Sequence, residues 1–393
     1  MSSTTVPIGD ICRVVGGGTP ARDVPQYYGG DIPWVTPKDM KMWEIQDAQI
    51  KITRAGLENS ATRLVPENSV LVVVRSGVLK HTVPVAISRT QVAINQDMKA
   101  FICSEHVDPD YLARFIKAQS PEILQWVRAT TADNFPVDKL KKLRISLPPL
   151  PEQRRIADIL DKADALRAKR RAALSQLEAL TQSIFLDMFG DPVTNPKGWP
   201  VAALAQKCTL AGEYGANVAS KEFDPDLPRY VRITDVTEDG DLNDQPVSPG
   251  GNPKDWEPYD LAAGDVLFAR SGATVGKTYM HRASDGRCVF AGYMIRFRAD
   301  RHELLPEYLF TFTRSSAYRA WVAARQRVVA QPNINAKQYG QELLIPLPPI
   351  RLQEAFAARM GDIQRTKALS RASGVQLDEL FSTLQHAAFR GEL

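Results

Sequence analysis

The sequence of 393 residues has few cysteines and no long apolar run. Its four cysteines, Cys12, Cys103, Cys208 and Cys288, are widely separated and form no Cys-x-x-Cys pair, which argues against a zinc knuckle and a disulfide framework. No apolar stretch approaches the roughly 20 residues that span a bilayer. The first ten residues lack the basic start and apolar core of a secretory signal. These absences favour a protein of the reducing cytoplasm.

Neither sign of charge dominates the chain. Lysine and arginine number 49 and aspartate and glutamate 45, so the formal net charge is +4. Such a small basic excess permits a polyanionic partner without requiring one. The five histidines show no metal-ligand spacing, and no Gly-x-Ser-x-Gly nucleophile elbow is present. The composition therefore indicates neither a metalloenzyme nor a serine hydrolase.

One segment, Gly272–Thr278, resembles a phosphate-binding loop. That motif has four residues between its glycines, whereas three separate Gly272 from Gly276. The corresponding segment of the first half, Gly77–Thr82, lacks the second glycine. A nucleotide-binding enzyme is therefore the least supported interpretation.

The most informative feature that is present is an internal repeat. Leu147-Pro148-Pro149 recurs as Leu347-Pro348-Pro349, and each copy precedes a long segment with apolar residues at heptad spacing. From Gln153 to Phe189 the offset to the second copy stays at 200 residues (347 minus 147). Shorter matches precede each long segment in the same order: Val65–Leu71 with Leu261–Leu267, Arg75-Ser76-Gly77 with Arg270-Ser271-Gly272, Asp110-Tyr111-Leu112 with Glu307-Tyr308-Leu309, and Asn134-Phe135 with Asn333-Ile334.

This order predicts an α+β protein with two α/β domains, each followed by a long helix. We expect a buried strand at Val70–Val74, its counterpart at Asp265–Arg270, and a helix from Asp110 to about Val127. The expected boundaries are 1–148 for the first domain, 149–190 for its helix, 191–200 for a linker, 201–348 for the second domain and 349–393 for its helix.

Heptad patterns in the two long segments predict a coiled coil. In the first, one seam is Ile156, Ala163, Leu177 and Ile184, interrupted by Arg170, and the second is Ile159, Leu166, Ala173 and Leu180. In the other, Phe356, Ile363, Leu377, Leu380 and Leu384 form the seam, which Ser370, Ser373 and Gly374 weaken. An intermolecular coiled coil has the same pattern, but two matched helices in one chain favour an internal pair.

Five motifs together resemble a known family: LPPLPEQRRIADIL (147–160), IPLPPIRLQ (345–353), RSGATVGKT (270–278), IPWVTPKDM (32–40) and AFRGEL (388–393). They are similar to the DNA specificity subunit of type I restriction-modification systems. The resemblance implies two target-recognition domains for a bipartite, asymmetric DNA site, with the two long helices packed antiparallel as a spacer. It further implies a subunit without a catalytic centre or cofactor, which binds two methyltransferase subunits and restriction subunits. S-adenosylmethionine, ATP and magnesium belong to those partners.

Candidate DNA contacts are polar side chains at loops, because Arg, Lys, Asn, Gln, Ser and Thr read base edges. The principal candidates are Arg75, Ser76, Lys80, Arg128, Thr131 and Asn134 in the first domain, and Arg270, Ser271, Lys277, Thr278, Arg327 and Asn333 in the second. Further candidates are His81, Thr130, Arg325, Gln326 and Gln331. Each of them could instead be a solvated residue or a phosphate contact, which positions DNA without specifying it.

Two interpretations remain open for the repeated and basic segments. Because Arg-Ser-Gly occurs in both copies, it favours a shared role, either a turn after the strand or a phosphate contact. The basic run Arg167–Arg171 indicates a solvated helix face or a contact with DNA backbone. The main alternative function is a tandem adaptor that binds proteins through the same loops, which steep salt dependence of DNA binding would exclude.

Overall fold

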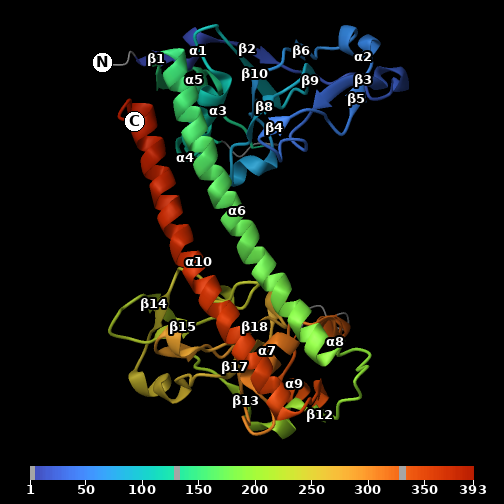
Figure 1. The fold of residues 1–393 in the computed structure, drawn as a ribbon, viewed down its shortest axis with the longest axis vertical. Helices are drawn as coiled ribbons and strands as arrows, with labels where there is room; N and C mark the ends of the chain where they lie inside the picture. The colour runs from blue at the N-terminus through green and yellow to red at the C-terminus, as the bar shows by residue number, and fades with distance from the viewer. Residues whose placement is uncertain (1–4, 128–132, 327–332) are drawn as a thin grey trace. The chain divides into compact units, whose positions relative to one another are not determined.

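The computed structural model describes residues 5–127, 133–326 and 333–393, and it divides into two compact units (Figure 1). The first unit comprises residues 1–170 and 372–393, and the second comprises residues 171–371. Each unit therefore contains one mixed domain together with parts of both long helices, α6 (Leu150–Phe189) and α10 (Ile350–Arg390).

The first domain contains a five-stranded sheet of order β2-β10-β7-β8-β4 and a four-stranded sheet of order β5-β3-β9-β6. The central strand of the five-stranded sheet, β7, is fully buried, and its successive side chains alternate between two different apolar clusters. The strands are β1 (Thr5–Pro7), β2 (Cys12–Gly16), β3 (Tyr28–Val35), β4 (Glu44–Ile45), β5 (Lys51–Ile52), β6 (Leu64–Val65), β7 (Val70–Val73), β8 (Val85–Ser88), β9 (Val92–Ile94), β10 (Met98–Cys103) and β11 (Arg144–Ser146). The helices are α1 (Ile8–Ile11), α2 (Arg54–Glu58), α3 (Pro109–Ala118), α4 (Ser120–Gln125) and α5 (Val137–Lys142).

The second domain contains a four-stranded sheet of order β13-β20-β17-β18 and three two-stranded pairs, β12-β21, β14-β16 and β15-β19. The strands are β12 (Val201–Ala203), β13 (Cys208–Tyr214), β14 (Ser220–Glu222), β15 (Arg229–Val231), β16 (Val247–Pro249), β17 (Asp265–Ala269), β18 (Thr278–Met280), β19 (Cys288–Phe290), β20 (Met294–Ala299) and β21 (Leu344–Pro346). The helices are α7 (Pro306–Phe312), α8 (Ser316–Gln326) and α9 (Ala336–Glu342).

The two domains share a strand frame. The order β2-β10-β7-β8 of the first matches β13-β20-β17-β18 of the second, with antiparallel pairing throughout both. Register fixes the correspondence, because Met98 pairs with Val73 and Met294 pairs with Ala269, an offset of 196 (294 minus 98). The expected strands at Val70–Val74 and Asp265–Arg270 are therefore confirmed, although β7 and β17 each end one residue earlier.

The helix expected from Asp110 to about Val127 is two helices, α3 and α4. The chain turns at Gln119, which caps α3 and precedes the second helix. Pro121 lies in the first turn of α4, where its missing N–H leaves no bond unmade. In the interior of one continuous helix the same proline would remove a backbone hydrogen bond, so the break is the consequence of this residue.

A buried glutamine joins each domain to the helix that follows it. Gln153 is fully buried; its Oε1 accepts from Asp108 N–H (2.8 Å), and its Nε2 donates to the carbonyls of His106 (2.9 Å) and Pro148 (2.8 Å). Gln353 is equally buried and repeats the pattern. Its Oε1 accepts from Leu305 N–H (2.8 Å), and its Nε2 donates to the carbonyls of Glu303 (3.1 Å) and Pro348 (2.9 Å).

The far end of each long helix packs onto the other domain. In the first unit Phe389, at the end of α10, contacts Tyr111 and Phe115, with ring centroids 5.5 Å and 5.2 Å away. In the second unit Phe189, at the end of α6, contacts Tyr308 at 4.8 Å and Phe356 at 5.2 Å. The start of one helix thus lies beside the end of the other within each unit, which confirms the internal antiparallel pair.

The second seam expected in α6, and Leu380 in the seam expected in α10, are wrong by one residue. Leu166, Leu180 and Leu380 are 54%, 45% and 53% exposed. The buried positions are instead those that follow the expected ones, as at Leu160, Thr181 and Phe381. The first seam stands, since Ile156 is buried and Ile184 is partly buried against the core. A heptad seam alternates steps of three and four residues. Where two neighbours are both apolar, as at Ile159 and Leu160, the spacing does not decide which of them lies in the seam.

Polar contacts occupy the middle of the seam. Within the first unit Arg167 pairs with Asp378, and its guanidinium lies 4.4 Å from the Phe381 ring centroid. Arg170 donates to the Ser373 hydroxyl. The helix α10 continues through Gly374, where an added Cβ would meet no atom within 4 Å. The basic run is therefore partly internal to the helix pair, because Arg167 and Arg170 contact the other helix.

No helix in the described ranges combines the length and the hydropathy that crossing a membrane requires.

We predict that Gln353→Ala lowers the free energy of unfolding by about 2–4 kcal/mol. The substitution leaves one buried N–H and two buried carbonyls without their partner, and each such group costs about 1–3 kcal/mol before local relaxation. Gln153→Ala should behave in the same way because its contacts are equivalent. Urea unfolding followed by circular dichroism measures the loss. Gln376→Ala, at an exposed position of α10, is the control. If it lowers the free energy of unfolding as much as Gln353→Ala does, the buried glutamine does not have the stabilising role assigned to it.

Candidate nucleic-acid interface

The end of β7 leads into a hydrogen-bonded turn in the first domain. The N–H groups of Val74 and Arg75 both donate to the Asp97 carbonyl, at 2.9 Å and 3.2 Å. Ser76 N–H donates to the carbonyl of Asp133 at 2.9 Å, and Arg75 forms a β-bridge with Asn134. Three of the predicted contact residues, Arg75, Ser76 and Asn134, are therefore brought together here.

The end of β17 forms the corresponding turn in the second domain. Arg270 N–H donates to the Tyr293 carbonyl at 3.1 Å, and Ile334 N–H donates to the Arg270 carbonyl at 2.8 Å. Ser271 forms a β-bridge with Asn333. The predicted residues Arg270, Ser271 and Asn333 thus also lie together. They lie beside β17 and β20, the strands that correspond to β7 and β10 of the first domain.

The expected match between the two Arg-Ser-Gly elements is wrong by one residue. Asn134 pairs with Arg75, whereas Asn333 pairs with Ser271. Consistently, the carbonyl of Val74 accepts from Phe135 as that of Arg270 accepts from Ile334. Arg75 is therefore equivalent to Ser271, at the strand offset of 196 (271 minus 75). Because successive residues of a strand point to opposite faces, the two arginines occupy different positions of the shared frame.

The two arginines have different surroundings. The Nε of Arg75 donates to Oδ1 of Asp97 at 2.5 Å, and its side chain is 48% exposed. The guanidinium of Arg270 lies 4.9 Å from the centroid of the Tyr214 ring. The Tyr214 hydroxyl oxygen in turn accepts from Ala336 N–H at 3.1 Å. Arg75 is thus oriented by a carboxylate and Arg270 by an aromatic face, a cation–π contact.

Ser76 and Lys80 bound the short helix η2 (Gly77–Lys80) after the first turn. The Ser76 hydroxyl accepts from Val78 N–H at 3.4 Å as an N-cap. Lys80 is exposed in the last turn of this helix, which His81 caps. Ser76 is thus engaged with the local backbone, whereas Lys80 is accessible to a partner.

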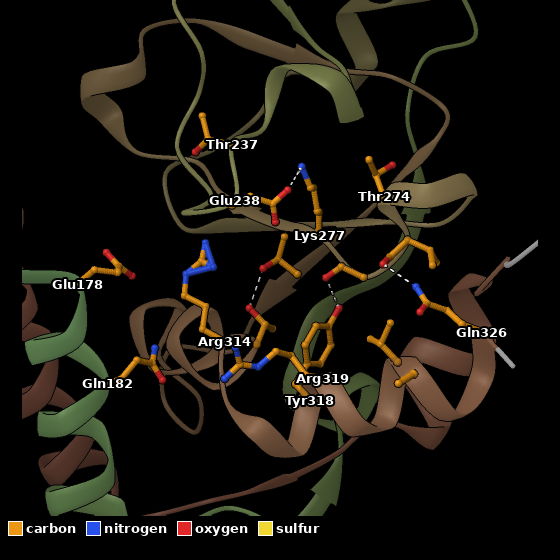
Figure 2. A pocket seen from close by; sticks show the side chains of 16 residues that line it. Glu178, Gln182, Thr237, Glu238, Thr274, Lys277, Arg314, Tyr318, Arg319 and Gln326 are labelled. Atoms are coloured by element: carbon orange, nitrogen blue, oxygen red, sulfur yellow. Dashed lines mark hydrogen bonds and ion pairs between the residues drawn. The ribbon is translucent and has the colours of Figure 1, made fainter. Parts of the chain in front are cut away.

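A cleft of about 550 Å³ lies beside the second turn, between the loop before β18 and α8 (Figure 2). Lys277 reaches across its edge to Glu238, with Nζ and Oε1 2.6 Å apart. Arg319 is exposed, and its guanidinium has no hydrogen-bond or ion-pair partner in the part of the chain that the structure describes. Burial lowers the pKa of the Arg314 guanidinium, which donates to the Asp239 carbonyl at 2.5 Å. The cleft thus presents cationic groups, two of which already have protein partners.

Thr278 is a poor candidate for DNA contact, contrary to expectation. Its side chain is 4% exposed, and its hydroxyl lies 2.7 Å from that of Thr313. The adjoining glycine has a structural explanation as well. Gly276 has φ of 88°, and an added Cβ would approach Val322 Cγ1 to 2.7 Å. Turn geometry and packing against α8 therefore account for the loop without a bound phosphate.

The remaining candidates divide into two sets. Arg128, Thr130, Thr131, Arg327 and Gln331 lie outside the described residues. Arg325 pairs with Glu342 at 2.7 Å, and Gln326 Nε2 donates to the Val275 carbonyl at 3.5 Å. Within 5–127, 133–326 and 333–393 no group of His, Cys, Asp and Glu side chains is arranged to hold a metal ion.

Sequence reasoning missed Asp97 and Tyr214, which orient the two arginines. Asp97 is 22 residues from Arg75 (97 minus 75), and Tyr214 is 56 from Arg270 (270 minus 214). Only the pairing of β10 with β7 in the first domain, and of β13 with β20 and β20 with β17 in the second, brings these residues near one another. No local motif in the sequence indicates either contact.

We predict that Thr278→Val lowers the free energy of unfolding and leaves the affinity for DNA unchanged. The substitution preserves shape but removes one buried hydroxyl hydrogen bond, which contributes about 1 kcal/mol. Thermal unfolding and fluorescence anisotropy with duplex DNA measure the two quantities. Lys80→Ala, an exposed change, is the matched comparison for DNA affinity. A large loss of affinity with Thr278→Val at unchanged stability would restore Thr278 as a contact residue.

Comparison with known proteins shows similarity to one family of DNA specificity subunits. The family description "Type I restriction modification DNA specificity domain" matches residues 2–178. Over 162 residues the chain is 36% identical to the EcoR124I/EcoR124II specificity subunit of Escherichia coli, covering 40% of each protein. Over 248 residues it is 29% identical to the MjaIX specificity subunit of Methanocaldococcus jannaschii, covering 58% of this chain and 56% of the relative. The matches thus span about half the length of these two relatives.

A solved structure shares the fold. The S subunit of a type I restriction-modification system from M. genitalium superposes with a TM-score of 0.56 at 12% identity, covering 98% of this chain and 96% of that one. At this identity the likeness concerns the fold alone. It confirms the predicted class of mixed domains joined by two long helices.

Proposed function

Because the chain is a relative of the DNA specificity subunits of type I restriction enzymes, we propose that it is a sequence-specific DNA-binding subunit. It recognises a bipartite, asymmetric site, with one half read by each domain. The boundaries proposed for the readers are 1–148 and 201–348. The observation that carries this proposal is a shared strand frame that presents different side chains. Arg75 and Asp97 in the first domain correspond by register to Ser271 and Tyr293 in the second.

Side-chain chemistry at the strand ends supports recognition of DNA. Arginine and asparagine donate to base edges in the major groove, and both also bind phosphates. Arg75 and Asn134 lie together at the first turn, and Arg270 and Asn333 at the second. The two turns have equivalent backbone structure but different side chains. Such a pair suits a DNA target with two unlike half-sites better than a target in which one motif is repeated.

Partner subunits supply the chemistry in this proposal. The chain itself is non-catalytic and directs methyltransferase and restriction subunits to the selected DNA. Exposed apolar residues on the long helices suit such docking, because apolar surface gains free energy when a partner covers it. Leu166 in the first unit is 54% exposed, and Leu369 in the second is 74% exposed. A tandem adaptor that binds proteins through both strand ends is the rival.

We predict that the complex assembled with its methyltransferase subunits binds duplex DNA, with affinity that falls steeply as salt rises. Each phosphate contact releases counterions, so the logarithm of affinity declines linearly with that of salt concentration. Anisotropy titrations at several salt concentrations measure the slope. Mapping the bases that the complex methylates then gives both half-sites and the gap. Absence of duplex binding at low salt would favour the adaptor.

We predict that replacing residues 201–346 with the corresponding segment of a relative changes one half-site only. The segment starts and ends on paired strands, since Val201 pairs with Pro346 in the β12–β21 ladder. The exchange therefore keeps its two ends adjacent and leaves both long helices intact. The methylation map of the exchanged complex measures the result, and the unchanged half-site is its internal control. Alteration of both half-sites would contradict separate readers.

A further inference from the structure

The side chain of Arg75 is held in one orientation. Its Nε donates to Oδ1 of Asp97 at 2.5 Å. Asp97 is fixed in turn, because its Oδ2 accepts from Asn95 Nδ2 at 3.1 Å and its N–H donates to Asn95 Oδ1 at 3.1 Å. Asn95 is buried, and Arg75 lies two residues after the end of the buried strand β7. The chain from core to guanidinium is thus hydrogen-bonded at each step.

The outer edge of the same guanidinium is unoccupied. Asp97 engages Nε, and neither Nη1 nor Nη2 has a partner among residues 5–127, 133–326 and 333–393. The Arg75 side chain is 48% exposed, so solvent or a ligand reaches these two nitrogens. An arginine that neutralises a carboxylate for stability alone commonly uses the bidentate geometry. Here the carboxylate takes one nitrogen and leaves a pair of donors directed elsewhere.

Two donors in the plane of a guanidinium match a group with two acceptors side by side. In duplex DNA the major-groove edge of guanine, with O6 and N7, is that group, and arginine binds it bidentately. We propose that Arg75, positioned by Asp97, reads a guanine in the half-site of the first domain. This inference rests on the proposed DNA-binding function and specifies the base and the residue.

The second domain has no arginine positioned by a carboxylate at the equivalent position. Ser271 stands where the first domain has Arg75, and Tyr293, which corresponds to Asp97 by register, brings no carboxylate. Arg270 belongs to the position of Val74 and stacks on Tyr214 instead. The guanine contact is accordingly specific to the first half-site, and the two domains differ in chemistry at one structural position.

The competing role for Arg75 is a phosphate contact. An arginine on a phosphate weakens binding to all sequences when it is removed and lowers the salt slope by about one. An arginine on guanine relaxes discrimination at one base pair, by about 1–3 kcal/mol, which corresponds to a loss of roughly 5- to 150-fold in affinity at about 1.4 kcal/mol per tenfold. The two roles thus predict different dependences on sequence.

The test uses the full chain assembled with its methyltransferase subunits, and duplexes carrying the site found by methylation mapping. Each guanine of the first half-site is replaced in turn by 7-deazaguanine, which removes the N7 acceptor, or by inosine, which retains O6 and N7. Affinity is measured for the unmodified complex and for the variants Arg75→Ala, Arg75→Lys and Asp97→Asn. Arg54→Ala is the matched control, because Arg54 is an exposed arginine paired with Glu58 at 2.7 Å.

One guanine should respond specifically. At that position 7-deazaguanine weakens binding of the unmodified complex by roughly 5-fold or more, within the range of one base contact, while inosine has little effect. In the Arg75→Ala complex the same replacement costs nothing further. Arg75→Lys and Asp97→Asn lose part of the discrimination, and Arg54→Ala loses none. Thermal unfolding of each variant establishes that the fold is retained.

Three results would overturn the inference. A first half-site without guanine on either strand removes the ligand. An equal loss of affinity by Arg75→Ala for every duplex, with a reduced salt slope, assigns the residue to a phosphate. Full sensitivity to 7-deazaguanine in the Arg75→Ala complex assigns the guanine to another residue. In all three cases the unmodified complex still binds DNA, which separates them from failure of the proposed function itself.

Discussion

Two buried amides are the constraint on which the rest of the structure depends. Gln153 and Gln353 each connect a long helix to the domain before it through three hydrogen bonds. A buried polar group without a partner is costly, so neither helix can tilt against its domain without breaking several bonds at once. The aromatic ends of the opposite helices then close each unit from the other side. Each domain is therefore held by both helices, and the loss of either helix exposes the core of both units.

This arrangement separates orientation from recognition. Three features repeat between the two halves. They are the buried glutamines, the strand order, and a tyrosine hydroxyl that donates to a backbone carbonyl, Tyr111 to Ser146 and Tyr308 to Pro346. The side chains at the strand ends do not repeat. A frame that is fixed by buried polar groups and packing tolerates change at exposed positions, where substitutions usually alter stability little. Different side chains can thus stand at the strand ends of one scaffold, as the asymmetric target proposed above requires.

The sequence predicted large features and missed those that depend on register. The repeat, the two long helices and their internal pairing follow from periodicity and from matched motifs, because both are properties of continuous segments. The positions of Leu166 and Leu380 were wrong because an apolar residue next to a seam has the same spacing as one within it. The match of Arg75 with Arg270 was wrong because identical letters outweighed a shift of one residue that only strand pairing reveals. Thr278 is a polar residue with a buried partner, and no local pattern distinguishes it from an exposed one.

The most buried charges are paired inside the chain and are not available to a polyanionic partner. Buried Asp265 pairs with Arg298, its Oδ1 2.6 Å from Nε, and lies 3.5 Å from Nη1 of Arg296, while Asp241 pairs with Arg282 and Arg371. Arg114 likewise pairs with Asp161 and Asp164. Other cations in the described ranges, such as Lys80 and Arg319, are exposed and form no ion pair with a described residue. Under the proposed function, exposed cations of this kind suit contacts with phosphates, whereas the oriented donors at the strand ends suit discrimination between bases.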